Sequence, residues 1–248
     1  MQFRMIHFRY FDAFMNMALD EAIMEGIRAG KALPTIRFYG WKPSAISIGY
    51  FQGVRNEVNL EACREAGVDV IRRMTGGGAV YHDTEGEVTY SIIGPLSLFP
   101  ENILESYRYI CGDLVDAFAT LEINAHFEPI NDIMVMDQKI SGNAQTRRGG
   151  ILLQHGTILY RVDVEKMFTL LNVDKVKVSD KLIKSVKKRV TSISDYSDVP
   201  IKKVIKALEK SFSWDREIIR AGYSAEEMAR ARQLAEEKYR TDAWVAMR

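Results

Sequence analysis

The sequence predicts an α+β protein in which a mostly antiparallel sheet is flanked by helices. Two segments of alternating character, residues 35–39 and 45–49, are separated only by a turn at 41–44. Connections this short favour hairpins, because parallel strands need longer crossovers that usually contain a helix. Much of the remaining chain has helical periodicity, so the helices are expected on the flanks of the sheet.

The first predicted helix covers about residues 16–28. Met17, Ala22 and Met24 supply part of its apolar face, and Gly30 provides a stop. The elements expected after it, in chain order, are strands at 35–39 and 45–49, a helix at 60–66, strands at 68–72 and 87–93, a helix at 100–121, strands at 132–135, around 139 and at 151–160, and helices at 164–171, 201–212 and 224–239. Ser224 and Glu227 form a capping-box signature for the last helix.

Length and composition indicate a soluble globular protein, which we interpret as one catalytic domain over residues 1–248 with a helical C-terminal segment from about 200. Lys and Arg number 34 against 33 Asp and Glu, a net charge of +1. This balance argues against nucleic acid or an anionic membrane as the main partner. No signal-peptide core or membrane-spanning run is evident, so a cytoplasmic protein is expected. The apolar stripe of the helix at 100–121 makes Cys111 a core residue.

The strongest candidate for chemistry is RRMTGGGAVYHD, residues 72–83. Three successive glycines after a strand expose backbone N–H groups and allow a ligand to approach the main chain closely. Arg73 offers a planar, charged fork for a carboxylate or phosphate. The segment therefore predicts an anion and nucleotide cradle, and its alternative is a tight turn with solvent-exposed arginines. It matches neither the Walker loop nor the Rossmann fingerprint.

A second candidate joins Asn131 and Asp132 to the segment KISGNAQ, residues 139–145. The Lys139 ammonium would offset negative charge that builds up during adenylate formation. Asp132 would orient that lysine or an acceptor amine, or bind Mg²⁺, and Gly142 would allow close backbone approach. Taken alone, a polar hairpin with a solvated lysine is the preferred explanation of these residues, since most lysines are exposed.

The segment Gln154-His155-Gly156-Thr157 lies inside an apolar strand. His155 is interpreted as a hydrogen-bonded histidine of the pocket wall in preference to a general acid or base, and His82 is treated in the same way. A basic run between Lys175 and Arg189 is interpreted mainly as a solvated helix face.

Together, RRMTGGGAVYHD, NDI, KISGNAQ and LQHGTIL resemble the lipoate–protein ligase A family in order and spacing. Weaker matches, such as SIGYFQ before the glycines and EKYRTDAW near the end, extend the likeness over nearly the whole chain. The resemblance implies the fold of biotin/lipoate ligases and class II aminoacyl-tRNA synthetases. It also implies a short form without a further C-terminal domain. In some members of the family, a small accessory ligase subunit completes such a form.

The resemblance implies a two-step reaction with ATP and Mg²⁺ as cofactors. Lipoate, or octanoate, and ATP give an acyl-adenylate, whose acyl group passes to a lysine of an acceptor protein. The implied partners are apo lipoyl domains of 2-oxoacid dehydrogenase complexes and the glycine-cleavage H protein. Lys139 matches the family's catalytic lysine. The residues that match or adjoin its acyl-adenylate-binding segments are Arg73, Thr75, Gly76, Gly77, Gly78, Ala79, Val80, Tyr81, His82, Asn131, Asp132, Gly142, Gln145, His155 and Gly156.

Two other functions remain open. An octanoyltransferase of the same superfamily uses a cysteine nucleophile and takes its acyl group from a carrier protein without ATP. Cys63 and Cys111 both lie away from the Lys139 and His155 segments in sequence, so this function lacks an evident nucleophile. The third possibility is a paralogue that binds lipoate or lipoyl domains without catalysis, and the intact Arg73, glycine run and Lys139 argue against it.

Overall fold

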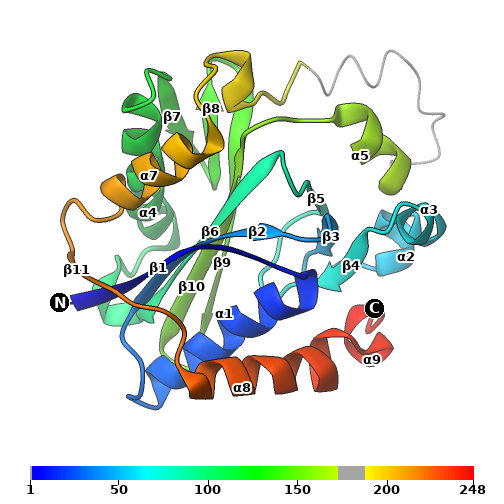
Figure 1. Cartoon of the computed structure of the whole chain (residues 1–248), viewed down its shortest axis with the longest axis horizontal. Coiled ribbons are helices and arrows are strands. Elements are labelled where there is room, and N and C mark those ends of the chain that lie inside the picture. The colour runs from blue at the N-terminus through cyan, green and yellow to red at the C-terminus, as the bar shows by residue number, and fades with distance from the viewer. Residues whose placement is uncertain (1, 173–187) are drawn as a thin grey trace.

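A computed structural model describes residues 2–172 and 188–248 (Figure 1). Its centre is an eight-stranded sheet in the order β11-β1-β2-β6-β10-β9-β8-β7. The strands are β1 (Gln2–Phe11), β2 (Thr35–Trp41), β6 (Glu87–Pro95), β7 (Ala125–Glu128), β8 (Asp132–Val135), β9 (Gln138–Arg148), β10 (Ile151–Leu159) and β11 (Glu217–Arg220). β1 pairs in parallel with β2 and β11, and the other neighbours are antiparallel. The predicted mostly antiparallel sheet is confirmed.

A smaller sheet stands beside one end of the large one. It has the order β4-β3-β5, with β4 at Asp69–Arg72, β3 at Ala45–Ile48 and β5 at Val80–His82. β3 is parallel to β4 and antiparallel to β5. The sequence did not predict β5 or a separate sheet. The glycine segment between β4 and β5 therefore belongs to the small sheet and faces the large one.

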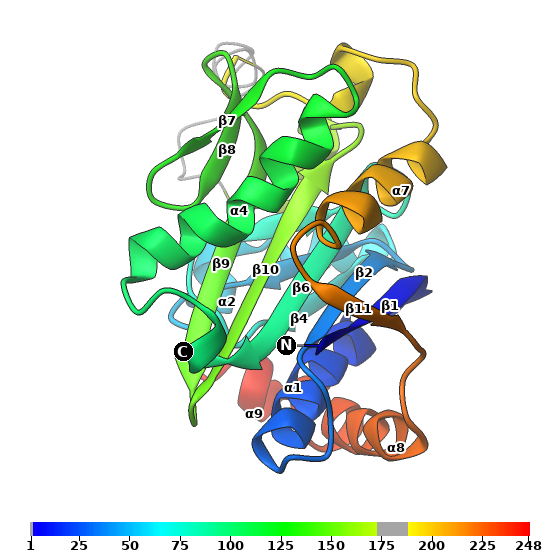
Figure 2. The ribbon, with the colours of Figure 1, turned by 90° about the vertical axis from the view of Figure 1, so that its left-hand side faces the viewer.

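Helices cover both faces of the large sheet, as Figures 1 and 2 show. On one face, α1 (Ala13–Arg28) and α8 (Ala225–Leu234) share an apolar cluster with Tyr39 and Trp41 of β2. On the other, α4 (Ile103–Ala119) and α7 (Ile201–Ser211) pack against Ile36 and Phe38 of the same strand. β2 is buried along its whole length because both faces of the pleat are covered.

Short elements complete the described chain: α2 (Val54–Glu57), α3 (Leu60–Glu65), α5 (Val164–Leu170), α9 (Asp242–Val245), 3₁₀ turns at Leu96–Leu98 and Ile193–Asp195, and a π-helical turn at Ala235–Tyr239. The capping box of Ser224 and Glu227 is confirmed. So is the core position of Cys111, which is fully buried. Of the basic run, only Lys188 and Arg189 lie among the described residues, and both are exposed.

In addition to β5, three strands of the large sheet were not predicted. β1 was missed because charged residues interrupt it, yet Arg4 is buried through a paired interaction with Glu227 of α8, at 2.5 and 2.8 Å. β7 and β11 are only four residues long. β11 also means that the segment from residue 200 is not purely helical, because it adds an edge strand to the large sheet.

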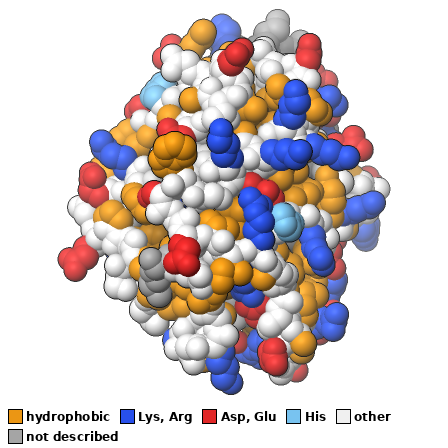
Figure 3. Space-filling model, turned by 60° about the vertical axis from the view of Figure 1, so that its left-hand side comes forward, with side chains coloured by type: hydrophobic (Ala, Val, Ile, Leu, Met, Phe, Trp, Pro, Cys, Tyr) orange, Lys and Arg blue, Asp and Glu red, His pale blue; other side chains and the backbone are white. Residues whose placement is uncertain are grey.

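On the surface, side chains of opposite charge lie close to one another. Basic, acidic and apolar side chains are interspersed on the face displayed in Figure 3. Within the described residues, no helix combines the length and the apolar character that crossing a membrane requires.

A buried ion pair joins α1 to the large sheet. Arg37 of β2 is fully buried and donates to Asp20 and to the backbone and side chain of Asn16, at 2.7–3.0 Å. It also lies 3.9 Å from the centre of the Tyr39 ring. A buried cation needs such partners, because removing it from water is otherwise costly.

We predict that Asp20→Ala lowers the free energy of unfolding by about 3–5 kcal/mol, because it leaves the Arg37 charge buried without its counter-ion. Urea unfolding measures the change. The control is Glu61→Ala, which breaks the exposed pair with Arg64 and should cost about 0–1 kcal/mol. Equal losses in the two variants would contradict the importance assigned to the buried pair.

Candidate active site

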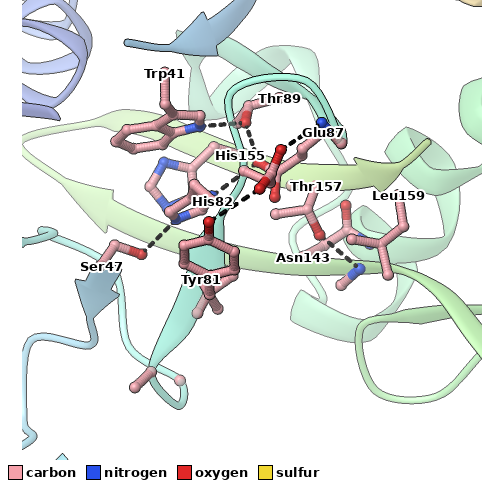
Figure 4. A pocket seen from close by; sticks show the side chains of 18 of the residues that line it. Trp41, Ser47, Tyr81, His82, Glu87, Thr89, Asn143, His155, Thr157 and Leu159 are labelled. Atoms are coloured by element: carbon pink, nitrogen blue, oxygen red, sulfur yellow. Dashed lines mark hydrogen bonds and ion pairs between the residues drawn. The ribbon is translucent and has the colours of Figure 1, made fainter. Parts of the chain in front are cut away.

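A pocket of about 350 Å³ lies where the two sheets meet. The large sheet contributes residues of β2, β6, β9 and β10, the small sheet contributes β3 and β5, and α5 reaches one end. Its apolar lining includes Met17, Tyr39, Trp41, Ala79, Val80, Ala144, Leu159, Val162, Met167 and Val190. Figure 4 shows polar side chains converging inside this apolar frame. A mostly apolar pocket with a few placed polar groups is typical of a small-molecule site.

The Arg73 guanidinium organises the glycine loop that forms one wall. It donates to the carbonyls of Gly76 and Gly78 at 2.8 and 2.7 Å, to the carbonyl and hydroxyl of Ser47 at 3.0 and 3.1 Å, and to the Thr75 hydroxyl at 3.1 Å. All five N–H donors of Arg73 are thus used within the protein. Arg73 lines the pocket, but a ligand anion would have to displace one of these acceptors to use its fork.

The arginines before the glycines are buried, in contrast to the solvent-exposed turn considered from the sequence. Arg72 is fully buried and donates to the carbonyls of Trp244 and Val245 in α9 at 3.0 and 2.8 Å. It also donates to three carbonyls of the loop after β3, at Gly49, Tyr50 and Gln52. The C-terminal helix is therefore fastened to the strand that leads into the glycine loop.

Lys139 and Asp132 form an ion pair at the edge of the pocket, with Lys139 Nζ 2.7 Å from Asp132 Oδ1. Their side chains are 38% and 32% exposed, so both can meet a ligand. Gly142 leaves room for the lysine head, since a Cβ there would lie 2.6 Å from Lys139 Cε. Asn131 holds this corner by donating to the carbonyl of Asn143 and accepting from its side-chain amide at 2.9 Å.

The residues at this corner provide little of a metal site by themselves. Among residues 2–172 and 188–248, no three His, Cys, Asp or Glu side chains converge in a way that would hold a metal ion. Asp132 is the one predicted ligand, and it pairs with Lys139. A Mg²⁺ ion that arrives with nucleotide phosphates needs only one or two protein carboxylates. Asp132 fits that limited role, so its function as a Mg²⁺ ligand stays a prediction.

Two hydroxyl–histidine–carboxylate arrangements contribute to the pocket wall, which includes both of their histidines. In the first, Ser47 Oγ is 2.8 Å from His82 Nε2, and His82 Nδ1 is 2.8 Å from Glu87 Oε1. In the second, Thr75 Oγ1 is 2.7 Å from His155 Nε2, and His155 Nδ1 is 3.3 Å from Asp20 Oδ2.

Burial sets the electrostatics of these two arrangements. Burial lowers the pKa of His155, against the opposing effect of Asp20. Trp41 stacks on the His82 ring at 4.0 Å and donates to Thr89, which in turn donates to Glu87 (Figure 4). Both imidazoles are therefore held on two sides within a low-dielectric environment.

The structure brings most of the predicted site residues together. Those that line the pocket are Arg73, Gly77, Gly78, Ala79, Val80, Tyr81, His82, Asn131, Lys139, Gly142, His155 and Gly156. Thr75 and Asp132 lie directly behind them, and Gly76 is held by Arg73. Gln145 is the exception: it bonds to Ser106 of α4 and to Gln154, outside the pocket lining.

Sequence reasoning did not find Ser47, Glu87, Asp20 or Trp41. Asp20 carried a detectable signal, because an acidic residue on the apolar face of a helix needs a buried partner. Glu87 follows His82 by five positions across a tight turn, a separation that gives no periodic signal. Ser47 is a small residue in a strand, and only the pairing of β3 with β5 places it near His82.

Neither cysteine reaches the pocket. Cys63 lies on α3 in the apolar cluster of the small sheet, and Cys111 lies on α4 in the core behind the large sheet. Burial raises the pKa of Cys63 to about 11 and that of Cys111 to about 12. Both thiols are therefore protonated near neutral pH, and the sequence contains no third cysteine.

The fold and the mostly apolar pocket with a few placed polar groups define an enzyme-type site for a small molecule. The family model of the lipoyl protein ligase A/B catalytic domain matches residues 12–213. The chain belongs to this family of lipoate ligases and transferases, as the sequence resemblance suggested.

The curated relatives include the octanoyltransferase LipM of Geobacillus kaustophilus, which is 36% identical and is matched over 97% of this chain and 96% of its own. LipM of Staphylococcus aureus is 32% identical, over 94% of each chain. Among solved structures, the bi-partite lipoate protein ligase of Thermoplasma acidophilum superposes with a TM-score of 0.89 at 32% identity, covering 99% of this chain and 96% of that one. A lipoate-protein ligase A bound with ATP gives 0.85 at 29%, over 99% of both.

We predict that Gly49→Ala displaces the glycine loop, because the added Cβ would lie 2.0 Å from the Gly77 carbonyl oxygen. Overpacking of this kind costs about 1–3 kcal/mol. Faster hydrogen exchange at residues 76–78 and a lower free energy of unfolding would show it. Gly112→Ala on α4 is the matched control, because no atom lies within 4 Å of the added Cβ. Unchanged loop exchange in Gly49→Ala would refute the assigned contact.

Proposed function

We propose that this chain is an ATP-dependent lipoate–protein ligase that activates lipoate as an acyl-adenylate and transfers the lipoyl group to a lysine of an acceptor protein. The observation that carries the proposal is the pairing of a pocket lysine, Lys139, with the complete exclusion of both cysteines from the pocket. An acyl-adenylate needs charge stabilisation and water exclusion, which a lysine and an apolar pocket supply. A covalent transferase needs a nucleophile.

In the proposed first step, a carboxylate oxygen of lipoate attacks the α-phosphorus of ATP and pyrophosphate leaves. The Lys139 ammonium lies at the pocket edge, where it would offset the charge that builds up at the phosphate. Asp132 fixes the position of that ammonium through the 2.7 Å ion pair. Mg²⁺, with Asp132 as its protein ligand, would neutralise part of the phosphate charge when bound.

In the second step, the neutral ε-amine of the acceptor lysine attacks the acyl carbonyl, the bond to the phosphate oxygen breaks, and AMP leaves. The amine loses one proton as the amide forms. The acceptors that the family suggests are apo lipoyl domains of 2-oxoacid dehydrogenase complexes and the glycine-cleavage H protein. The Thermoplasma acidophilum relative is a bi-partite lipoate protein ligase that has an E2 lipoyl domain in the same lipoylation system. This supports both an acceptor of this kind and an accessory ligase subunit for this chain.

The competing function is octanoyl transfer, because the curated relatives named above are octanoyltransferases. That reaction takes its acyl group from a carrier protein without adenylation. The buried, protonated thiols argue against it for this chain if a cysteine nucleophile is required.

Transfer from preformed lipoyl-AMP to an apo lipoyl domain, read by intact mass, tests the proposal. We expect the lipoyl domain to gain one lipoyl group, with the wild type and equally with the Cys63→Ser/Cys111→Ser double variant. Because both thiols are buried, we also expect no labelling of the folded wild type by a thiol reagent. Octanoyl carrier protein as donor, without ATP, should give no product. Transfer from the carrier protein that is lost in the double variant would establish the octanoyltransferase instead.

We predict that Lys139→Ala reduces acyl-adenylate formation by about 10²-fold or more, because removing one preorganised charge that acts on the transition state has effects of this size. Pyrophosphate release from lipoate and ATP, with the accessory subunit present if one is needed, measures the rate. Because Lys139 is partly exposed, the variant should unfold at the wild-type temperature. An unchanged rate would remove Lys139 from the mechanism.

A further inference from the structure

The two hydroxyl–histidine–carboxylate arrangements meet at one residue, Arg73. Its Nη1 donates to Ser47 Oγ at 3.1 Å, and its Nε donates to Thr75 Oγ1 at 3.1 Å. One network therefore runs from Arg73 through Ser47 and His82 to Glu87, and the other through Thr75 and His155 to Asp20. Nη2 of the same guanidinium, which belongs to neither network, donates to the carbonyls of Gly76 and Gly78.

The directions of the hydrogen bonds can be followed from the two ends of each network. A guanidinium can only donate, so Ser47 Oγ and Thr75 Oγ1 both accept from Arg73. At the other end, each histidine Nδ1 faces a carboxylate oxygen, so the ring hydrogen is assigned to Nδ1. Each hydroxyl hydrogen is assigned to the histidine Nε2, because these hydroxyls contact no other acceptor among the described residues. Trp41 fixes the first network independently: its indole donates to Thr89, so the Thr89 hydroxyl donates to Glu87 Oε1, and that oxygen is an acceptor.

The arrangement of Ser47, His82 and Glu87 has the composition of a nucleophilic triad, but its surroundings do not suit one. Ser47 is only 1% exposed, and its oxygen already accepts an Arg73 hydrogen bond. His82 is 4% exposed beneath Trp41. A nucleophile needs an accessible oxygen and a base that can release its proton to a leaving group.

We propose that Ser47 and Thr75, backed by His82–Glu87 and His155–Asp20, are positioning residues that hold Arg73 against the glycine loop, with both histidines neutral and protonated on Nδ1. The carboxylates fix the imidazoles, the imidazoles orient the hydroxyls, and the hydroxyls fix the guanidinium. Arg73 then keeps the carbonyls of Gly76 and Gly78 turned toward itself. The loop is thus ordered before its ligand arrives, so ligand binding does not have to supply the free energy of ordering it.

The inference rests on the proposed function only in taking lipoyl-AMP as the ligand of the loop. Ser47→Ala removes one acceptor from Arg73 and should weaken lipoyl-AMP binding about tenfold, the size of effect expected for one hydrogen bond to a charged group. If the loop binds the ground state and the transition state equally well, Ser47→Ala should raise KM and leave kcat little changed. Ser47→Thr keeps the hydroxyl and should restore much of the affinity.

Ser211→Ala is the matched control, because Ser211 is also buried and donates to the Asp113 carbonyl, far from the pocket. It should lose comparable stability and keep wild-type affinity. An affinity loss in Ser211→Ala equal to that of Ser47→Ala would overturn the positioning role. A fall in kcat with unchanged KM in Ser47→Ala, or an acyl adduct on Ser47 by intact mass, would replace it with a nucleophile.

Nitrogen-15 NMR of the imidazoles tests the network without any substrate, and four histidines make assignment by single substitution practical. Near neutral pH we expect His82 and His155 to carry hydrogen on Nδ1 and none on Nε2. Glu87→Gln keeps an oxygen acceptor and should preserve the His82 tautomer, whereas Glu87→Ala should lose it. An Nε2–H tautomer or a charged ring in the wild type would refute the proposal. Because this result requires no ligase activity, it separates failure of the network from failure of the proposed function.

Discussion

The arrangement of this site depends on one guanidinium placed among backbone carbonyls. Arg73 is 5% exposed and its N–H groups are used entirely by neutral oxygens. Burial without a directly bound carboxylate lowers its pKa to about 10. A buried cation tolerates this only if every donor is satisfied. The glycine loop, Ser47 and Thr75 satisfy these donors. The conformation of the loop and the hydrogen bonding of the buried Arg73 therefore depend on each other.

The surrounding structure follows from that requirement. The two hydroxyls that accept from Arg73 come from β3 of the small sheet and from the segment after β4. The histidines that orient these hydroxyls are His82 of β5 and His155 of β10. The carboxylates come from β6 and α1. Asp20 also neutralises the buried Arg37, so the helix that covers the large sheet is joined to the pocket through one side chain. The neighbouring Arg72 binds the C-terminal helix in the same way, through backbone carbonyls.

This arrangement divides the pocket into a rigid part and an accessible part. The buried histidines and hydroxyls hold the wall, while Lys139 and Asp132 stand at the edge with about a third of each side chain exposed. The phosphate chemistry that we propose requires a charge that the ligand can reach, and the pair of Lys139 and Asp132 offers one. Two sources of acyl group fit the family, and the location of the two thiols is the feature of this chain that favours adenylation.

The sequence by itself determined the α+β class, most helices, the glycine segment and the Lys139 segment, because hydrophobic periodicity and glycine runs are local signals. It could not give β1, whose buried Arg4 finds its partner 223 positions away. The sequence predicted that Arg73 binds a ligand, whereas in the structure its N–H groups donate to the glycine loop and to neighbouring oxygens. Ser47, Glu87 and Asp20 entered the site only through strand pairing and helix packing. Ser47 and Asp20 contact histidines 35 and 135 positions away, and no local pattern records such neighbours. Glu87 lies only five positions after His82, but the turn between them gives no periodic signal.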